Sequence, residues 1–303
     1  PETAFANLQE ITLESSGKQD GTGKKAYDCM AKIKKLNSNL DQESVLDNIE
    51  LTCTIFDSNL SATIENILLS PYRSNEDMQT YYMLDATAAK MKFADIEFSA
   101  QTITVDTKTK ELMLHECTGI YHSPYKILGT LHFITSEPIK IKNMILFGRN
   151  IHITAHDFNT HIQELEVNYQ EEGRAKNITT CMKDFVIFIE KIYIKNSGKT
   201  INSKSIEKII ANNIKCTRNK TGENLEIISS IAYIEKNKLI LPKPISINTD
   251  KVSLVAQNGY QEGTKIFLKR IKFKTASATG YSDAGYFDIK NKELILENGK
   301  IEW

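Results

Sequence analysis

The nonapeptide DTKTKELML occupies residues 106–114, and the closely similar DIKNKELIL occupies residues 288–296. A third version, YIEKNKLIL, lies between them at 233–241. In each, a short charged segment precedes apolar residues two apart, such as Leu112 and Leu114. Alternation with a period of two is typical of a β-strand with one buried face, and charged segments between strands are typical of exposed turns. We therefore interpret each nonapeptide as a hairpin turn followed by its return strand.

The similarity between these regions extends upstream into a longer, degenerate repeat. Its common form is a strand, a small residue, a second strand, a polar turn and a third strand. A three-stranded unit of this size cannot bury its apolar face alone, whereas stacked units share one continuous core. The sequence thus predicts a mainly β protein, an elongated stack of β units of the jellyroll or solenoid type. The repeat is carried by residues 48–69, 95–114, 150–167, 224–241, 251–268 and 271–296.

Two segments depart from the β pattern. Residues 40–49 and 203–215 carry Ile or Leu at helical spacing, including Ile206, Ile209 and Ile210. They predict one or two short helical insertions. The expected organisation has four parts: a flexible or looped segment over 1–25, an N-terminal β stack over 26–200, a helical or loop excursion over 201–223, and a C-terminal β stack over 224–303.

Composition limits the classes of function. The chain has 303 residues, of which 41% are hydrophobic, so it can bury a large core. Lysine plus arginine and aspartate plus glutamate both number 38, and the lysines are scattered, which gives no indication of a nucleic-acid partner. No window approaches 18 consecutive apolar residues, as a transmembrane helix requires.

The cysteines and the first residues bear on the compartment. Five cysteines occur without a CxxC pair, and the odd number predicts at least one free thiol in a monomer. Ala4-Phe5-Ala6 matches the small-x-small pattern that precedes signal-peptidase cleavage. The remnant of an export signal and a chance match are both open interpretations of this tripeptide.

A candidate phosphate-binding loop is weak. The segment NSGKT (196–200) resembles the end of such a loop, but the motif requires glycine five residues before Gly198, where the chain has Tyr193. A tyrosine would obstruct the wrap of the backbone around a phosphate. A polar turn is the better interpretation.

Two loose clusters contain metal-ligating residue types. Ligands for one metal on a strand are usually two apart, so that they face the same way, and neither cluster keeps this spacing throughout. Surface side chains near turns explain them better, nothing marks Cys117 as an activated thiol, and no cofactor is predicted. The clusters are His152, His156, Asp157 and His161, and His115, Glu116, Cys117 and His122.

Carboxylates recur at the turns and not around one cleft, which suits turn formation better than acid–base catalysis. No nucleophile elbow or metalloprotease helix occurs, and we predict that the protein is not an enzyme. The turn carboxylates are Asp106, Glu111, Asp157, Asp288 and Glu293.

The C-terminal segment FKTASATGYSDAGYFDIKNKELILENGKIEW (273–303) resembles the OstA-like repeat of the lipopolysaccharide-transport proteins, the LptA and LptC group. The similarity is clear over this unit and weaker over 95–121 and 224–273. The matching positions are Ala278, Ala284, Tyr286, Asp288, Leu294-Ile295-Leu296, Asn298-Gly299 and Ile301.

The resemblance implies a β-jellyroll of stacked V-shaped slabs in the periplasm or cell envelope. Its apolar interior would shield the acyl chains of a lipid or lipopolysaccharide-like amphiphile, without cofactor or catalytic residues. Basic residues at the rim, Lys269, Arg270 and Lys272, would meet phosphates. The expected groove residues are Phe98, Leu112, Leu114, Ile153, Leu241, Leu254, Leu268, Phe273, Leu294 and Leu296.

Two other functions fit the same pattern. The strands can fill a closed core, which would make the chain a structural or adhesive β-solenoid that binds proteins. A carbohydrate-active β-helix enzyme is the third hypothesis. Open-ended stacks also expose strand edges, so we expect head-to-tail association of the chain with itself or with related envelope proteins.

Overall fold

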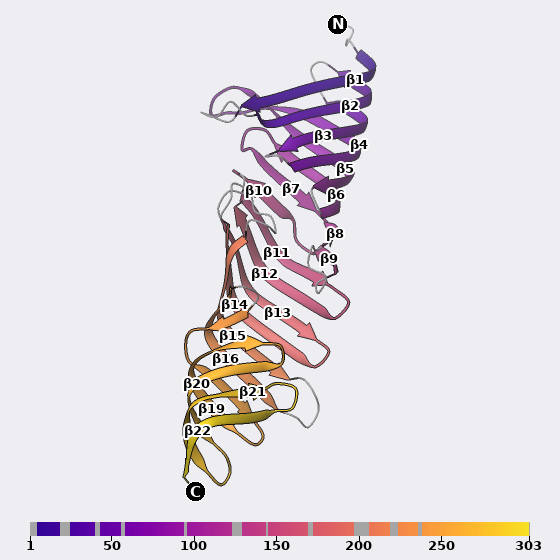
Figure 1. The fold of residues 1–303 in the computed structure, drawn as a ribbon. Coiled ribbons are helices and arrows are strands. Elements are labelled where there is room, and N and C mark those ends of the chain that lie inside the picture. The colour runs from indigo at the N-terminus through magenta and orange to yellow at the C-terminus, as the bar shows by residue number, and fades with distance from the viewer. Residues whose placement is uncertain are drawn as a thin grey trace. The chain divides into compact units, whose positions relative to one another are not determined.

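A computed structural model describes residues 5–18, 25–39, 43–55, 58–93, 96–122, 129–143, 145–168, 172–196, 206–218, 224–235 and 238–302. Within these ranges the chain forms 22 β-strands and no helix (Figure 1). All of the strand pairs described below are antiparallel. The chain divides into two compact units: unit 1 is 1–156 with 166–169, and unit 2 is 157–165 with 170–303.

The first eleven strands belong to unit 1. They are β1 (Phe5–Lys18), β2 (Lys25–Asn39), β3 (Ser44–Ile55), β4 (Ser58–Arg73), β5 (Thr80–Phe93), β6 (Ile96–Asp106), β7 (Glu111–His115), β8 (Thr118–His122), β9 (Thr130–Thr135), β10 (Ile139–Lys142) and β11 (Ile145–Thr154).

The other eleven strands follow, and β12 contributes its first residues to unit 2. They are β12 (Phe158–Asn168), β13 (Glu172–Met182), β14 (Phe185–Asn196), β15 (Ile206–Arg218), β16 (Leu225–Glu235), β17 (Lys238–Leu241), β18 (Ile245–Thr249), β19 (Ser253–Glu262), β20 (Lys265–Lys274), β21 (Thr279–Asp288) and β22 (Glu293–Glu302).

Within each unit the strands form a meander, in which successive strands pair in chain order (Figure 1). In three places two short strands take the place of one long strand. The halves of β6 pair with β8 and β7, β11 pairs with β9 and β10, and the halves of β16 pair with β18 and β17. These divided strands mark the two arms into which each meander is bent.

The bend occurs at a residue that is skipped in the pairing. On β3, Ile49 pairs with Ile33 and Asp47 pairs with Lys35, but Asn48 between them has no partner in this register, and its φ is 51°. A left-handed residue inside a strand shifts the side-chain alternation and bends the strand, as in a β-bulge. We call the residues that are skipped in the pairing at the bend the corner residues. Those with positive φ lie on alternate strands and include Glu10, Asn48, Ala88, Asn177, Asn213, Arg270 and Asn298.

The corner changes the spacing of the buried side chains from two to three. Leu46 and Ile49 are both buried on β3, and Leu268 and Ile271 are both buried on β20. Both arms therefore present apolar side chains to the same side of the bent sheet, which we call the inner face. In unit 1, arm 1A contains β8 and β9, and arm 1B contains β7 and β10. In unit 2, arm 2A contains β18, and arm 2B contains β17. Each long strand crosses the corner, and each of its halves belongs to the arm whose strands it pairs with.

Side chains from both arms pack against each other next to the corner. In unit 2 the largest cluster joins Ile271 of arm 2A, Leu268 of arm 2B and Phe287 of arm 2B, all of them within 2% of complete burial. In unit 1, Ile49 and Leu46 pack together from the two sides of Asn48. Burial of these side chains is the main favourable contribution to folding, at about 25 cal/mol per Å² of apolar surface.

The helical insertions predicted from the sequence are wrong. Residues 44–49 lie in β3, and residues 206–215 lie in β15, which pairs with both β14 and β16. The excursion expected over 201–223 is therefore a strand in its described part, and 201–205 and 219–223 lie outside the described residues. The segment 1–25, expected to be looped, contains β1. The predicted mainly β class is confirmed, as one long antiparallel arrangement of strands.

The hairpin interpretation of the repeated nonapeptides is confirmed. Asp106 pairs with Glu111, and Asp288 pairs with Glu293, so both turns contain four residues. In each turn the aspartate Oδ1 accepts a hydrogen bond of 2.9 Å from the backbone N–H two residues later, at Lys108 and Lys290. The third nonapeptide is the β16–β17 hairpin, in which 236–237 lie outside the described residues.

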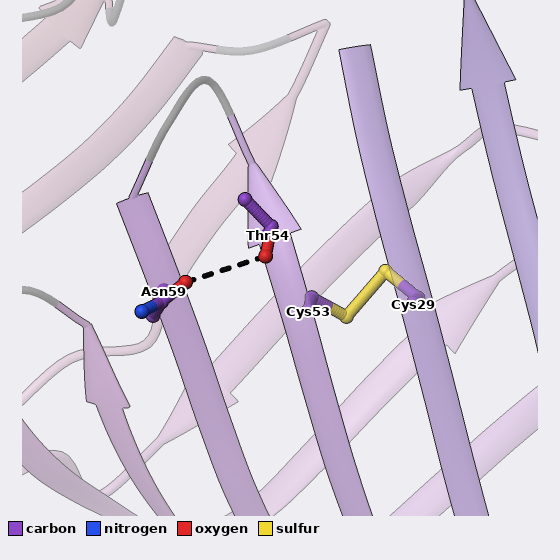
Figure 2. Close-up of a disulfide and its surroundings, with 4 residues drawn as sticks. All are labelled: Cys29, Cys53, Thr54 and Asn59. Atoms are coloured by element: carbon purple, nitrogen blue, oxygen red, sulfur yellow. Dashed lines mark hydrogen bonds between the residues drawn. A yellow bond between two sulfur atoms is a disulfide. The ribbon is translucent and has the colours of Figure 1, made fainter. Parts of the chain in front are cut away.

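One disulfide joins neighbouring strands of unit 1. Cys29 on β2 lies directly opposite Cys53 on β3, with the two Cα atoms 4.1 Å apart (Figure 2). Cys117, Cys181 and Cys216 are free thiols, in agreement with the odd cysteine count. The cross-link closes a segment of 24 residues, and on chain-entropy grounds a loop of this length stabilises the folded state by about 3 kcal/mol.

Substitution of the corner core should destabilise the protein far more than substitution of the opposite face. We expect Ile271→Ala, at a fully buried side chain, to lower the free energy of unfolding by about 2–5 kcal/mol. Ile295→Ala, at a side chain 41% exposed on the outer face, should lower it by less than about 1 kcal/mol. Denaturant unfolding followed by circular dichroism measures both, and equal losses would contradict the proposed core.

Candidate functional site

The inner face of arm 1A carries a row of apolar residues that crosses seven strands of the meander. Each residue is opposite the next in the strand register, so the side chains form one continuous band. The row contains Leu51, Ala62, Met91, Phe98, Gly119, Phe133 and Ile153. Glycine at position 119 is required by packing, because a Cβ there would collide with the ring of Phe133.

Arm 1B carries two apolar rows on its inner face. The row nearer the corner is well buried at Ile103, Leu114 and Ile139. The row farther from the corner is only half-buried along its length, although it consists almost entirely of large aliphatic side chains. Its members are Leu69, Leu84, Val105, Leu112, Ile141 and Leu146.

Unit 2 has equivalent inner rows, but its C-terminal strands pack more tightly. Ile245, Ile247 and Leu254 of arm 2A are at most 1% exposed, and Ile266 and Phe287 of arm 2B are at most 2% exposed. The two arms close on each other here. The half-buried apolar rows of unit 1 therefore offer more accessible inner surface than the C-terminal part of unit 2.

All ten residues expected to line a groove lie on inner faces. Phe98 and Ile153 share the row of arm 1A, and Leu112 and Leu114 lie on the two rows of arm 1B. In unit 2 the residues fall into three rows. Leu241, Leu268 and Leu296 share one, with Gly259 and Gly285 between them; Leu254 and Phe273 share another; and Leu294 lies beside Phe287 in the third. Contact with a lipid remains a prediction for all ten.

Sequence reasoning missed several members of the unit 1 rows. Met91 and Phe133 lie in the same row as Phe98, and Leu69 and Leu84 lie in the same row as Leu112. Their segments have the same period-two alternation as the repeat. The alternation could have identified them if the shift at each corner had been known.

The three predicted rim residues lie on the outer side of the bend. Arg270 is itself a corner residue, with φ of 53°, and Lys269 and Lys272 flank it with their side chains exposed. Lys269 lies opposite Ala284, and Lys272 lies opposite Val255 and Tyr281, all of which belong to outer rows. This position is away from the inner face, so these side chains do not border the apolar rows.

A hollow of about 1000 Å³ lies on arm 1A alone. Most of its lining comes from the outer rows, which alternate with the apolar inner row along each strand. Lys92 and Glu97 form an ion pair of 2.8 Å within it, and Ser99 and Thr118 share a hydrogen bond of 2.9 Å. The lining also includes six of the seven residues of the apolar inner row of arm 1A, from Leu51 to Phe133.

The loose histidine and cysteine clusters do not form a metal centre. Among the described residues, no group of three or more His, Cys, Asp or Glu side chains is placed to hold a metal ion. Cys117 is fully buried beside Thr135, whose Oγ1 accepts a 3.3 Å hydrogen bond from the Cys117 N–H. Burial raises the pKa of the Cys117 thiol to about 11, which keeps it protonated at neutral pH and argues against a nucleophilic role.

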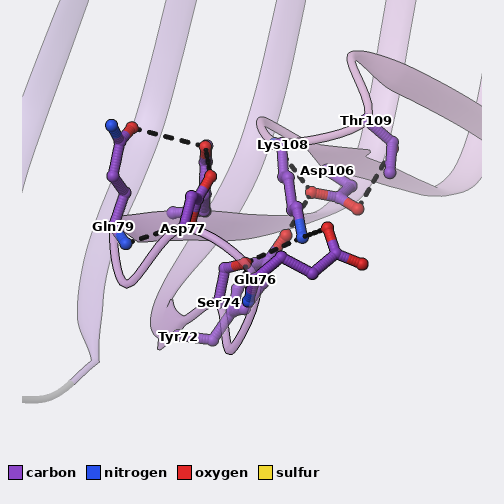
Figure 3. A network of polar contacts seen from close by, with 9 residues as sticks. Tyr72, Ser74, Glu76, Asp77, Gln79, Asp106, Lys108 and Thr109 are labelled. Atoms are coloured by element: carbon purple, nitrogen blue, oxygen red, sulfur yellow. Dashed lines mark hydrogen bonds and ion pairs between the residues drawn. The ribbon is translucent and has the colours of Figure 1, made fainter.

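A polar network joins two turns of unit 1 (Figure 3). The Tyr72 hydroxyl donates a 2.6 Å hydrogen bond to Asp106, and Lys108 Nζ donates to Ser74 Oγ at 2.8 Å and to Glu76 at 2.7 Å. The bond from Tyr72 holds the pKa of Asp106 below its usual value, and it raises the pKa of Tyr72 to about 12.

The Ser74–Lys108 contact has the composition of a catalytic dyad but not its electrostatics. A lysine that acts as a general base needs a lowered pKa, which burial away from carboxylates provides. Here the hydrogen bond to Glu76 raises the pKa of Lys108. Ser74 is also 4% exposed, out of reach of a substrate. The network therefore clamps the β4–β5 turn to the β6–β7 turn.

A search of protein-family models finds no match to this chain, and a search of curated proteins finds none either. None of the described residues forms a helix that could span a membrane. The functional interpretation therefore depends on the inner and outer faces of the two units.

The clamp should make the stability of unit 1 sensitive to acid. Because the pKa of Asp106 is lowered on folding, its contribution is fully present above the ordinary value of 3.8 and is lost as the pH falls through the folded value. We expect Asp106→Asn to destabilise the protein at neutral pH, and we expect this difference to shrink below pH 3.8. Thermal unfolding over a pH series measures the stability difference between the variant and the unchanged chain. Glu297→Gln, at an exposed carboxylate of β22, is the control. A difference that does not change with pH would contradict a role for the carboxylate charge.

Proposed function

We propose that this protein binds a lipid-like amphiphile non-covalently through the inner face of unit 1, without a cofactor and without chemistry on the ligand. The observation that carries the proposal is the pair of apolar rows, on arms 1A and 1B, that face the inside of the bend and remain half-buried. An exposed apolar surface of this kind is unfavourable in water unless a ligand covers it.

The rows suit an acyl chain for a physical reason. Transfer of one methylene from water to an apolar surface contributes about 0.8 kcal/mol, so contact with several methylenes gives substantial affinity. Such binding needs length and continuity of apolar surface more than directed polar groups. The row through Met91, Phe98 and Phe133 provides both, since each residue lies opposite the next.

The proposed location is the periplasm or cell envelope of a bacterium. Structural disulfides persist in oxidising compartments and are rare in the cytosol, and Cys29–Cys53 supports export on that ground. The likeness of 273–303 to the OstA-like repeat supports an envelope protein of the lipopolysaccharide-transport type, with lipopolysaccharide as one candidate amphiphile.

A filled-core β-solenoid that binds proteins is the second candidate. The tight cluster of unit 2 favours it, because Ile245, Ile271 and Phe287 are completely buried and leave no accessible inner surface between the arms at that level. The two candidates differ in what they predict for unit 1, where a filled-core module has no use for half-buried apolar rows.

Uptake of a fluorescent fatty acid by the purified chain tests the proposal. We expect Phe98→Gln and Leu112→Gln, each at a half-buried inner position, to weaken uptake at least about tenfold, which corresponds to about 1.4 kcal/mol of binding free energy. Ile134→Gln, at a side chain 53% exposed on the outer face of arm 1A, is the matched control and should bind as the unchanged chain does.

Mass spectrometry of lipids extracted from the purified protein provides a second measurement. Absence of both fatty-acid uptake and co-purified lipid would exclude the amphiphile-binding function and favour the filled-core module. Uptake that all three variants retain would place the binding site elsewhere in the chain.

We also propose head-to-tail association through the strand edges. Within the described residues β22 pairs only with β21, and unpaired backbone groups at a sheet edge pair readily with another strand. We expect the mass measured by light scattering to rise with protein concentration, and Ile301→Lys, at a side chain of β22 that is 50% exposed, to reduce the rise. A constant monomer mass at high concentration would refute the association.

A further inference from the structure

The outer face of arm 2A carries a row in which large apolar side chains alternate with polar ones. Each residue lies opposite the next on the neighbouring strand, from β14 to β22. We call this row the outer stripe. It consists of Phe188, Lys215, Ile228, Ser246, Val255, Lys272, Tyr281 and Lys300.

The apolar members of the outer stripe are unusually exposed for their position. The solvent face of an antiparallel sheet is normally polar, and clustered exposed apolar side chains mark interaction surfaces. The exposed fractions are 39% for Phe188, 40% for Ile228, 51% for Val255 and 46% for Tyr281. With strands about 4.8 Å apart, the stripe extends for roughly 34 Å, which is longer than a small-molecule site.

All charged residues of the outer stripe are lysines. Lys215 is paired with Glu226 of the adjacent outer row, at 2.5 Å, and Lys300 Nζ lies 5.9 Å from the centre of the Tyr281 ring. Among the described residues no carboxylate pairs with Lys272. The exposed end of the stripe is therefore both apolar and cationic.

The neighbouring outer residues increase this positive charge. On strands β19–β22 of arm 2A, the stripe and the outer row beside it contain three cations and one carboxylate, so the charge there is positive by two. The cations are Lys272, Lys274 and Lys300, and the carboxylate is Glu302.

We propose that the outer stripe docks the protein on the surface of an anionic phospholipid bilayer. The lysine ammonium groups would lie at the lipid phosphates. The aliphatic stems of these lysines, with Val255 and Tyr281 between them, would contact the apolar part of the bilayer just below the phosphates. Tyrosine is favoured at such an interface because its ring is apolar and its hydroxyl is polar. Lysine is depleted at protein–protein interfaces, so this composition favours a lipid surface over a protein partner.

This surface is separate from the proposed amphiphile site. The stripe belongs to the outer face of unit 2, whereas the amphiphile rows belong to the inner face of unit 1. Docking on a bilayer would bring the protein to the membrane that supplies or receives the amphiphile. Bilayer docking does not require amphiphile binding, and amphiphile binding does not require docking.

Co-sedimentation of the full chain with vesicles tests the docking. One set of vesicles contains phosphatidylcholine alone, and the other contains phosphatidylcholine with an equal amount of phosphatidylglycerol. We expect binding to the anionic vesicles that weakens as salt is added, and much weaker binding to phosphatidylcholine alone. An absence of binding to the anionic vesicles would overturn the proposal.

Paired variants then locate the surface. Lys272→Gln with Lys300→Gln should weaken vesicle binding about fivefold for each lysine, and Val255→Ser with Tyr281→Ser should also weaken it. The controls are Lys290→Gln, at an exposed turn lysine, and Ile295→Ser, at an exposed apolar residue of arm 2B; both should bind as the unchanged chain does. Equal binding by stripe variants and controls would overturn the assignment.

Two further results separate this proposal from others. Phe98→Gln should keep its vesicle binding, which distinguishes failure of docking from failure of the amphiphile site. Binding of a polyglutamate peptide at the stripe, without vesicle binding, would replace the bilayer with an acidic protein partner. Circular dichroism of every variant verifies that the sheet is intact.

Discussion

The structure depends on the need of a one-layer sheet to bury one of its faces. A meander has an apolar face that nothing else in the unit can cover, so the sheet must bend until its own arms cover each other. The bend is made by a corner residue on alternate strands, where a left-handed backbone lets side chains three positions apart, such as Leu268 and Ile271, point to the same side. Asparagine occupies many of these corners because it tolerates positive φ better than most residues.

The same construction produces two different interiors. In the C-terminal strands, large side chains such as Phe287 and Ile271 fill the space between the arms, and the core excludes water. In unit 1 the residues beside the corner on β5 and β6 are small, Ala89 and Ala100, and the large aliphatic row of arm 1B lies farther out, where it is half-buried. The location of large side chains along each arm thus decides whether a unit has a filled core or an accessible apolar surface.

The outer faces are not uniform either. The outer rows of arm 1A carry the Lys92–Glu97 ion pair and the Ser99–Thr118 hydrogen bond, whereas the outer stripe of arm 2A is apolar and cationic. Because side chains alternate between faces, the outer rows can change without disturbing the core residues beside them. A meander of this kind can therefore combine an inner ligand surface with an independent outer docking surface.

The sequence was sufficient to predict strands, hairpin turns and the residues that share a face within one arm. Alternation with a period of two reports these local features directly, as at Leu294 and Leu296. It failed at the corners. Leu46 and Ile49 are three apart because they lie on either side of the corner at Asn48, and this spacing imitates that of a helix. The adjacent Ile209 and Ile210 also suggested a helix, because both faces of arm 2B carry apolar rows.

What the sequence by itself determined is the all-β class and the alternation along each strand, since both follow from neighbouring residues. The tertiary structure alone decided where each strand bends, which arms face each other and how closely they approach. It also moved Lys269, Arg270 and Lys272 from an expected rim to the outside of the bend. These features depend on pairings between residues distant in the chain, which a local period cannot report.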